Sequence, residues 1–178
     1  MRLVAAAAVL AAAAAGTATP ASAQEIPTRA CEARIEAGDA PLRFPGPRSG
    51  SVFAGPLALA GLFPKTVSEL GPRRPNGRFF AKVGALVRAG KPVVLSVPER
   101  YRSRLFLHYS RTDRGEPVVR IEPCAPSTRA FSYDGRVGPV TGFSGGFEVT
   151  HAGCYPLDVR VVGGRSYRVR LSLGRPCR

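Results

Sequence analysis

Ser144 lies in the pattern that comes nearest to a catalytic motif, because residues 142–146 read Gly-Phe-Ser-Gly-Gly and fit Gly-x-Ser-x-Gly. A nucleophile elbow places this pattern between a strand and a helix, whereas residues 147–149 are expected to continue as a strand. The base could only be His108 or His151, the two histidines of the chain. A serine hydrolase that uses Ser144 with His108 or His151 is therefore the alternative function. The glycines otherwise predict a bulge or close backbone packing.

The sequence predicts no metal site and no cofactor. His151 and Cys154 are three residues apart, but the cysteines of an exported chain are expected to be oxidised. The carboxylates are scattered, and no spacing brings two of them together as glycoside hydrolysis requires.

A stripe of arginines near the C-terminus is the candidate binding site. Arg160, Arg168 and Arg170 alternate with apolar residues in two runs joined by Gly163-Gly164, a pair that predicts a two-residue hairpin loop. The residues expected to be buried are Val159, Val161, Tyr167, Val169 and Leu171. The predicted binding residues are Arg160, Arg165, Arg168 and Arg170, extended by Arg175 and Arg178.

Alternation turns these arginines to one face of the hairpin, where Asp158 is the only acid, so like charges are expected side by side. Guanidinium groups at that spacing could bind successive phosphates of an anionic wall polymer or lipid headgroups. The competing interpretation is a charged face that only protects the sheet from aggregation.

The net charge of the whole chain also favours an anionic partner, but it does not identify one. The 26 basic residues outnumber the 12 acidic ones and give a formal net charge of +14. Such a surface attracts polyanions, although a GC-rich genome, which favours arginine codons, would produce a similar composition. No specific nucleic-acid partner is predicted.

Short apolar runs with period two, separated by glycine and proline, predict an all-β protein. About eight strands at this spacing are typical of a two-sheet antiparallel sandwich with immunoglobulin-like connections, and a small closed β-barrel is the alternative. Residues 51–62 are expected to form an edge or bulged strand, residues 79–88 a single strand, and residues 142–173 a β-meander.

The four cysteines predict two disulfides. If the strands that end near Cys124 and begin near Cys154 are antiparallel neighbours, those two residues meet. The expected pairs are therefore Cys124 with Cys154 and Cys31 with Cys177.

The chain begins with an export signal. Arg2 precedes a mostly alanine stretch that ends in Ala21-Ser22-Ala23, a signal-peptidase site. Residues 1–23 are thus the predicted signal peptide, residues 24–50 an N-terminal arm and residues 51–178 the β domain. No transmembrane segment is expected after cleavage, which predicts a secreted protein that either stays at the cell wall or diffuses away.

Several short motifs carry a family resemblance. The succession GPLALAGL (residues 55–62), VRAGKPVVLSVP (87–98), TGFSGGF (141–147), CYPLDVRV (154–161) and SLGRPC (172–177) resembles a group of uncharacterised secreted β-domain proteins of actinobacteria. The resemblance implies a signal peptide, disulfides and a β fold, and carries no activity. The favoured function is therefore a secreted non-enzymatic β-sandwich module that binds an anionic polymer, surface or protein partner.

Overall fold

The computed structural model describes residues 25–36, 38–47, 49–62, 65–66, 70–110 and 114–177, so the predicted signal peptide lies outside the described residues. The described part is all-β, as predicted, with two short 3-10 turns, η1 (Cys31–Ala33) and η3 (Glu99–Tyr101). It contains more strands than the eight or so predicted, and all of them except the last two have only two to five residues. They are β1 (Thr28–Arg29), β2 (Val52–Ala54), β3 (Leu57–Ala60), β4 (Lys65–Thr66), β5 (Phe79–Lys82), β6 (Gly84–Arg88), β7 (Val93–Ser96), β8 (Leu105–Leu107), β9 (Val118–Ile121), β10 (Val140–Phe143), β11 (Gly146–Val149), β12 (Gly153–Val161) and β13 (Ser166–Gly174).

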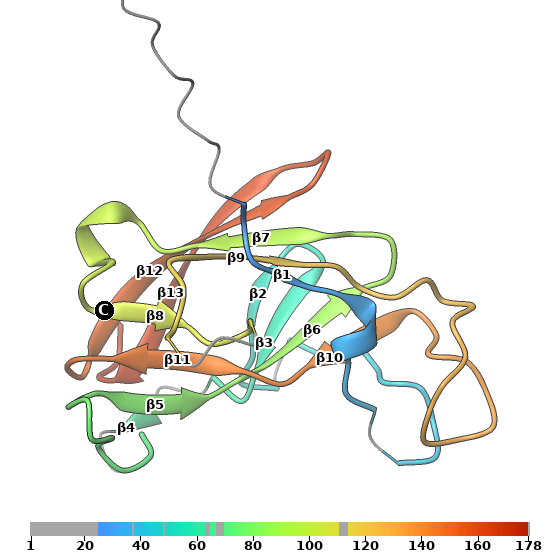
Figure 1. The fold of residues 1–178 in the computed structure, drawn as a ribbon, viewed down its shortest axis with the longest axis horizontal. Coiled ribbons are helices and arrows are strands. Elements are labelled where there is room, and N and C mark those ends of the chain that lie inside the picture. The colour runs from blue at the N-terminus through green and yellow to red at the C-terminus, as the bar shows by residue number, and fades with distance from the viewer. Residues whose placement is uncertain are drawn as a thin grey trace, which may run out of the picture.

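The strands form three sheets, and nearly all pairings are antiparallel (Figure 1). The six-stranded sheet has the order β1-β9-β7-β12-β13-β4, the four-stranded sheet β10-β6-β3-β2, and the three-stranded sheet β5-β11-β8. Within the described residues each sheet ends in edge strands and none closes on itself. The alternative of a small closed barrel is therefore wrong.

A single bent ladder connects the two smaller sheets. In the four-stranded sheet Arg88 pairs with Val140, and in the three-stranded sheet Lys82 pairs with Gly146. Both pairs belong to one continuous register between residues 79–88 and residues 140–149. β5 thus continues into β6 and β10 into β11, and the ladder changes sheet at residues 83–84 and 144–145. The single strand expected over residues 79–88 is therefore present as β5 and β6, which are interrupted at Val83.

Close packing explains why the ladder bends where it does. A Cβ on Gly145 would lie 2.4 Å from Cδ1 of Tyr109, and one on Gly146 would lie 2.1 Å from the carbonyl oxygen of Ala81. Tyr109 is fully buried, and its hydroxyl donates a hydrogen bond of 2.9 Å to the Val83 carbonyl at the break. Burial raises the pKa of Tyr109, which keeps it a donor. The glycines serve close packing, as one interpretation of the motif predicted.

The predicted meander is wrong for its first strand. β11 belongs to the three-stranded sheet, whereas β12 and β13 form a hairpin in the six-stranded one. The turn of that hairpin differs from the expected two-residue loop, because only Gly163 has a positive φ and the Gly164 N–H donates to the Val161 carbonyl at 3.0 Å. The expected edge strand over residues 51–62 is also a hairpin, β2–β3, with Gly55-Pro56 in its turn.

Apolar residues from all three sheets share one core. The largest fully buried side chains are Tyr109, Phe143, Phe147, Leu57, Leu59, Leu95, Leu105, Leu107, Ile121, Leu157, Leu171 and Leu173. On the β12–β13 hairpin Val159, Val161 and Leu171 are buried and Tyr167 and Val169 pack partly buried against the same core. The inward face of the hairpin is thus the one that alternation predicted.

Two disulfides are present, but the predicted pairing is wrong. The bonds join Cys31 to Cys124 and Cys154 to Cys177. The prediction took β9 and β12 as antiparallel neighbours. β7 lies between them and is antiparallel to both, so β9 and β12 run parallel and Cys124 and Cys154 lie at opposite ends of the sheet.

Strand register places the true partners together. β1 pairs in parallel with β9, Arg29 opposite Ile121, and this brings Cys31 beside Cys124 just beyond the two strands. At the other end of the sheet Cys154 lies opposite Ser172. The chain turns back after β13, and the Cys177 N–H donates to the Ser172 hydroxyl at 3.1 Å.

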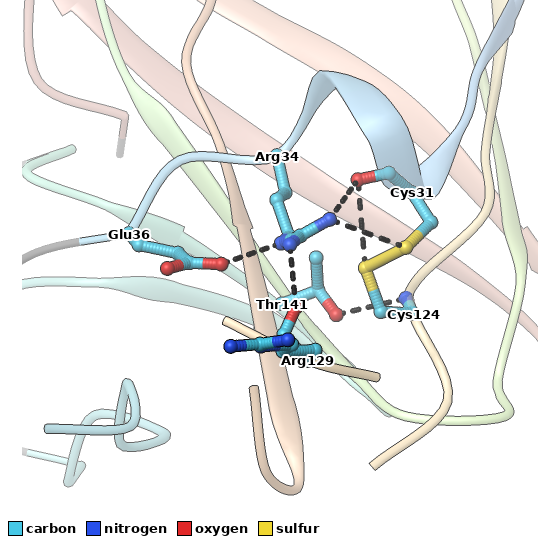
Figure 2. The surroundings of a disulfide bond; sticks show 6 residues. All are labelled: Cys31, Arg34, Glu36, Cys124, Arg129 and Thr141. Carbon is cyan, nitrogen blue, oxygen red and sulfur yellow. Dashed lines mark hydrogen bonds and ion pairs between the residues drawn. A yellow bond between two sulfur atoms is a disulfide. The ribbon is translucent and has the colours of Figure 1, made fainter. Parts of the chain in front are cut away.

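Ionic and hydrogen-bonded contacts surround the Cys31–Cys124 bond, as Figure 2 shows. Arg34 binds Glu36 at 2.7 Å and the Arg129 carbonyl at 2.8 Å, so it links the N-terminal segment to the loop at residues 125–139. Glu36 also accepts hydrogen bonds from the backbone N–H groups of Phe131 and Ser132 at 2.7 and 2.9 Å.

These contacts control the ionisation of Glu36. Burial alone would raise the pKa of this carboxyl, but the hydrogen bonds from Ser132, Arg34 and Phe131 outweigh burial and lower it to about 2. The segment around Cys31 is therefore bound to the loop by a charged carboxylate as well as by a covalent bond.

The bend gives a first prediction. Replacing Tyr109 by Phe leaves the buried Val83 carbonyl without its donor and should lower the free energy of unfolding by about 1–3 kcal/mol, seen as a lower urea midpoint at unchanged slope. Tyr133→Phe is the control, because that hydroxyl donates to the Arg136 carbonyl in an exposed loop, and it should change stability by about 0.5 kcal/mol or less. Equal effects of the two substitutions would contradict this role of Tyr109.

Acid sensitivity gives a second prediction. Because the pKa of Glu36 is lowered by folding, its stabilisation is complete above the ordinary pKa of 4.5 and is lost as the pH falls from there to about 2. Glu36→Gln should therefore lower the free energy of unfolding at pH 7 by about 1.5–3 kcal/mol, and the difference from wild type should shrink towards pH 2. Glu32→Gln, at an exposed carboxyl nearby, is the control; a difference that is constant with pH would refute this assignment.

Candidate functional site

The predicted arginine stripe lies on the outer face of the β12–β13 hairpin, whose tip projects at the top of Figure 1. Arg160, Arg168 and Arg170 are exposed, and Arg165 is exposed beside the turn. Arg175 follows β13 and is exposed as well, whereas Arg178 is outside the described residues. The structure thus brings the four predicted binding residues to one hairpin.

The cross-strand register prevents the expected contact between like charges. Arg168 lies opposite Asp158, Arg160 opposite Ser166 and Arg170 opposite Pro156. The Arg168 guanidinium binds Asp158 through one edge, with Nε donating to Oδ1 at 2.6 Å and Nη2 donating to Oδ2 at 3.0 Å. These hydrogen bonds and the charge of Asp158 raise the pKa of Arg168. Each arginine therefore faces an acid, a hydroxyl or a proline.

The face extends across the sheet to a residue that the sequence analysis did not select. Val94 on β7 lies between Arg160 on β12 and Arg120 on β9 in one row of the ladder. Directly opposite residues point to the same side of a sheet, so Arg120 shares the outer face. Val94 is only 3% exposed although it is outside the main core, as expected if the arginine stems on either side cover it.

We call Arg120, Arg160, Arg165, Arg168 and Arg170 the arginine face. Arg120 is partly neutralised by Glu122, with Nε 2.8 Å from Oε1. A hollow of about 550 Å³ lies over β7, β12 and β13. Its polar side chains are Ser96, Asp158, Arg160, Ser166 and Arg168.

Ser144 does not meet a base in the structure. It is exposed between β10 and β11, at the bend of the ladder. The His108 ring has Nε2 3.4 Å from Glu148 Oε2 and packs edge-on to Phe80, and His151 contacts the hydroxyl of Thr150 at 3.0 Å. In the described part of the chain neither histidine hydrogen bonds to Ser144. Cys154 forms a disulfide and so offers His151 no thiolate for a shared metal.

A buried charge cluster on the three-stranded sheet escaped the sequence analysis. Glu148 on β11 is 1% exposed, although alternation alone predicts that its side chain faces water. Its carboxylate accepts from Arg74 at 3.4 Å, Asn76 at 3.2 Å and Arg78 at 3.1 Å, besides the contact with His108.

The loop that contains Arg74, Asn76 and Arg78 covers Glu148 and keeps its carboxylate ionised. Burial alone would raise the pKa of this carboxyl, but hydrogen bonds from Asn76 and Arg78 and the attraction of His108 outweigh burial and lower it. The dipeptide Asn76-Gly77 is typical of a turn, but this pattern does not indicate which strand the loop covers.

Comparison of the chain with protein-family models, curated proteins and solved structures gives no match. Function is therefore inferred from the chain's own side chains.

The surroundings of Ser144 give a prediction for the hydrolase alternative. A serine-reactive fluorophosphonate probe should not label the protein, because the His108 ring is directed to Glu148 and His151 to Thr150, and within the described residues neither histidine reaches the Ser144 hydroxyl to activate it. Mass spectrometry of the treated protein measures this. Labelling that disappears in Ser144→Ala would instead support the hydrolase.

Proposed function

We propose that this protein is a secreted, non-enzymatic β module of the cell exterior, where the arginine face binds an anionic polymer. The observation that carries the proposal is the strand register. It gathers arginines from β9, β12 and β13 on one side of a sheet, with Asp158 and Glu122 as the neighbouring carboxylates.

The spacing of the arginines favours a polymer over a single anion. Arg168 and Arg170 are two residues apart on one strand, which corresponds to about 6.8 Å. Arg160 and Arg120 are two strands apart, which corresponds to about 9.6 Å. These are spacings of backbone positions, so the guanidinium groups are spread over an area that successive phosphates of an extended chain can cover, and planar guanidinium groups suit them.

A lipid surface is less well supported. Exposed large apolar side chains among the described residues are Ile26, Ile35, Phe53 and Phe131. None of them lies on β9, β12 or β13. Ile26 precedes β1, which pairs with β9 beside Arg120, so the arginine face has one exposed apolar side chain near its edge and none on its own strands. The favoured partner is therefore a wall polymer with repeated phosphate groups, and anionic vesicles serve as a comparison in the test.

The covalent features support an extracellular location. All four cysteines are paired, and disulfides persist in oxidising compartments. Together with the export signal predicted over residues 1–23, they favour secretion, with the protein at the cell wall. The described residues include no helix with the length and apolarity needed to cross a bilayer.

The finer architecture that we propose is a two-layer sandwich. The bent ladder joins the four- and three-stranded sheets into one layer, and the six-stranded sheet supplies the other. A single cluster of buried residues drawn from all three sheets supports this view. The immunoglobulin-like order of connections stays a prediction.

Arginine replacement tests the function. The triple variant Arg160→Gln, Arg168→Gln, Arg170→Gln should bind long-chain inorganic polyphosphate on the order of 100-fold more weakly at low salt, given about 1 kcal/mol per arginine near an anionic surface. Wild-type affinity should also fall steeply as salt rises, because binding releases counterions. Fluorescence anisotropy of labelled polyphosphate measures both effects.

The control variant has the same net charge as the triple variant of the arginine face. Arg43→Gln, Arg73→Gln and Arg100→Gln remove three exposed arginines that lie off the arginine face, and this variant should retain most of the affinity. Equal losses of affinity in both triple variants would show that net charge alone, and not the arginine face, attracts polyphosphate. Binding to anionic vesicles but not to polyphosphate would assign the face to lipid, and no binding to either would refute the proposal.

A further inference from the structure

We propose that Arg74 and Arg78 form a second anion site, which takes one oxyanion group such as a phosphate and is separate from the arginine face. The proposal does not rest on the proposed function, since it concerns another sheet and other residues. Its basis is the way in which Glu148 and two phenylalanines hold the two guanidinium groups.

The two arginines are fixed by their own loop before any ligand binds. The Arg74 N–H donates to the Arg78 carbonyl at 2.7 Å, and the Gly77 N–H donates to the Arg74 carbonyl at 2.8 Å. Asn76 closes the turn by accepting the Arg78 N–H at 3.0 Å. Arg74 and Arg78 therefore face each other across a tight turn.

The sheet beneath them fixes their guanidinium planes. Glu148 on β11 pairs with Phe80 on β5 and with Phe106 on β8, so one row of the sheet reads Phe80, Glu148, Phe106. The Arg74 guanidinium carbon lies 4.3 Å from the centre of the Phe80 ring, and that of Arg78 lies 3.6 Å from the centre of the Phe106 ring. Stacking of this kind lowers the entropy that a guanidinium loses when it binds an anion.

Both guanidinium groups keep most of their donors. Each binds Glu148 through Nη1 alone, and no further acceptor for either side chain is found among the described residues. The side chains are 41% and 31% exposed, so the other N–H groups meet solvent. Arg168 is the contrast, since two of its three nitrogens donate to Asp158.

The charges of the cluster favour an anion. Two arginines oppose one carboxylate, and Lys82 is exposed one row further along the same face, opposite Gly146. The two Nη1 atoms lie 3.4 and 3.1 Å from the oxygens of a single carboxylate, so the guanidinium groups are near enough to share one tetrahedral oxyanion. Glu148 would lie beneath them, shielded from the ligand by the arginines.

Titration with inorganic phosphate tests the site. The wild type should show saturable binding by calorimetry, and Arg74→Gln and Arg78→Gln should each weaken it about tenfold or more, as expected for one charged hydrogen bond. Arg74→Lys and Arg78→Lys keep the charge on Glu148 but lose the planar fork, and they should weaken binding while the fold is retained. Circular dichroism verifies folding of each variant.

Arg73→Gln is the matched control. Arg73 adjoins Arg74, but its Nε donates to the Gly77 carbonyl and does not contact Glu148, so this variant should bind phosphate like the wild type. The triple variant of the arginine face should also bind it normally, which separates this site from the proposed function. No saturable binding by the wild type, or equal weakening in Arg73→Gln, would overturn the proposal.

Discussion

The bend in the ladder formed by residues 79–88 and 140–149 is the constraint on which the rest of the structure depends. At this point backbone approaches backbone so closely that Gly145 and Gly146 admit no Cβ, and Tyr109 satisfies the Val83 carbonyl left open by the break. Because of the bend, the paired segments 79–88 and 140–149 contribute strands to two sheets. It also sets Ser144 at a corner, where a Gly-x-Ser-x-Gly pattern has a packing explanation.

Arginine is used in this protein in three different ways. Arg34 is buried and joins Glu36 to a loop carbonyl next to a disulfide. Arg168 is exposed and shares one edge of its guanidinium group with Asp158. Arg74 and Arg78 cover a buried carboxylate and keep donors directed to solvent. Each of these side chains carries the same charge, but local pairing decides how many of its N–H donors remain for a ligand. The net charge of the protein therefore does not identify a partner.

Alternation of apolar and polar residues predicted the strands near the C-terminus and their buried face, because a strand and its buried face can both be inferred from one continuous segment of sequence. Pairing could not be predicted in the same way. The disulfide prediction failed because β7 lies between β9 and β12, and Arg120 was overlooked because its row is completed through β7. Glu148 was expected to face water, since the loop that covers it comes from 70 to 74 residues earlier in the chain.

We propose the outer face of the six-stranded sheet as the polymer-binding surface. The most direct measurement is a residue-resolved titration of the isotope-labelled protein with polyphosphate, followed by amide chemical shifts in solution. Binding at this face should concentrate the shifts on β9, β12 and β13, at Arg120, Arg160, Ser166, Arg168 and Arg170. Shifts confined to the loop at residues 125–139 or to β2–β3, or small shifts spread evenly over all exposed arginines, would contradict it.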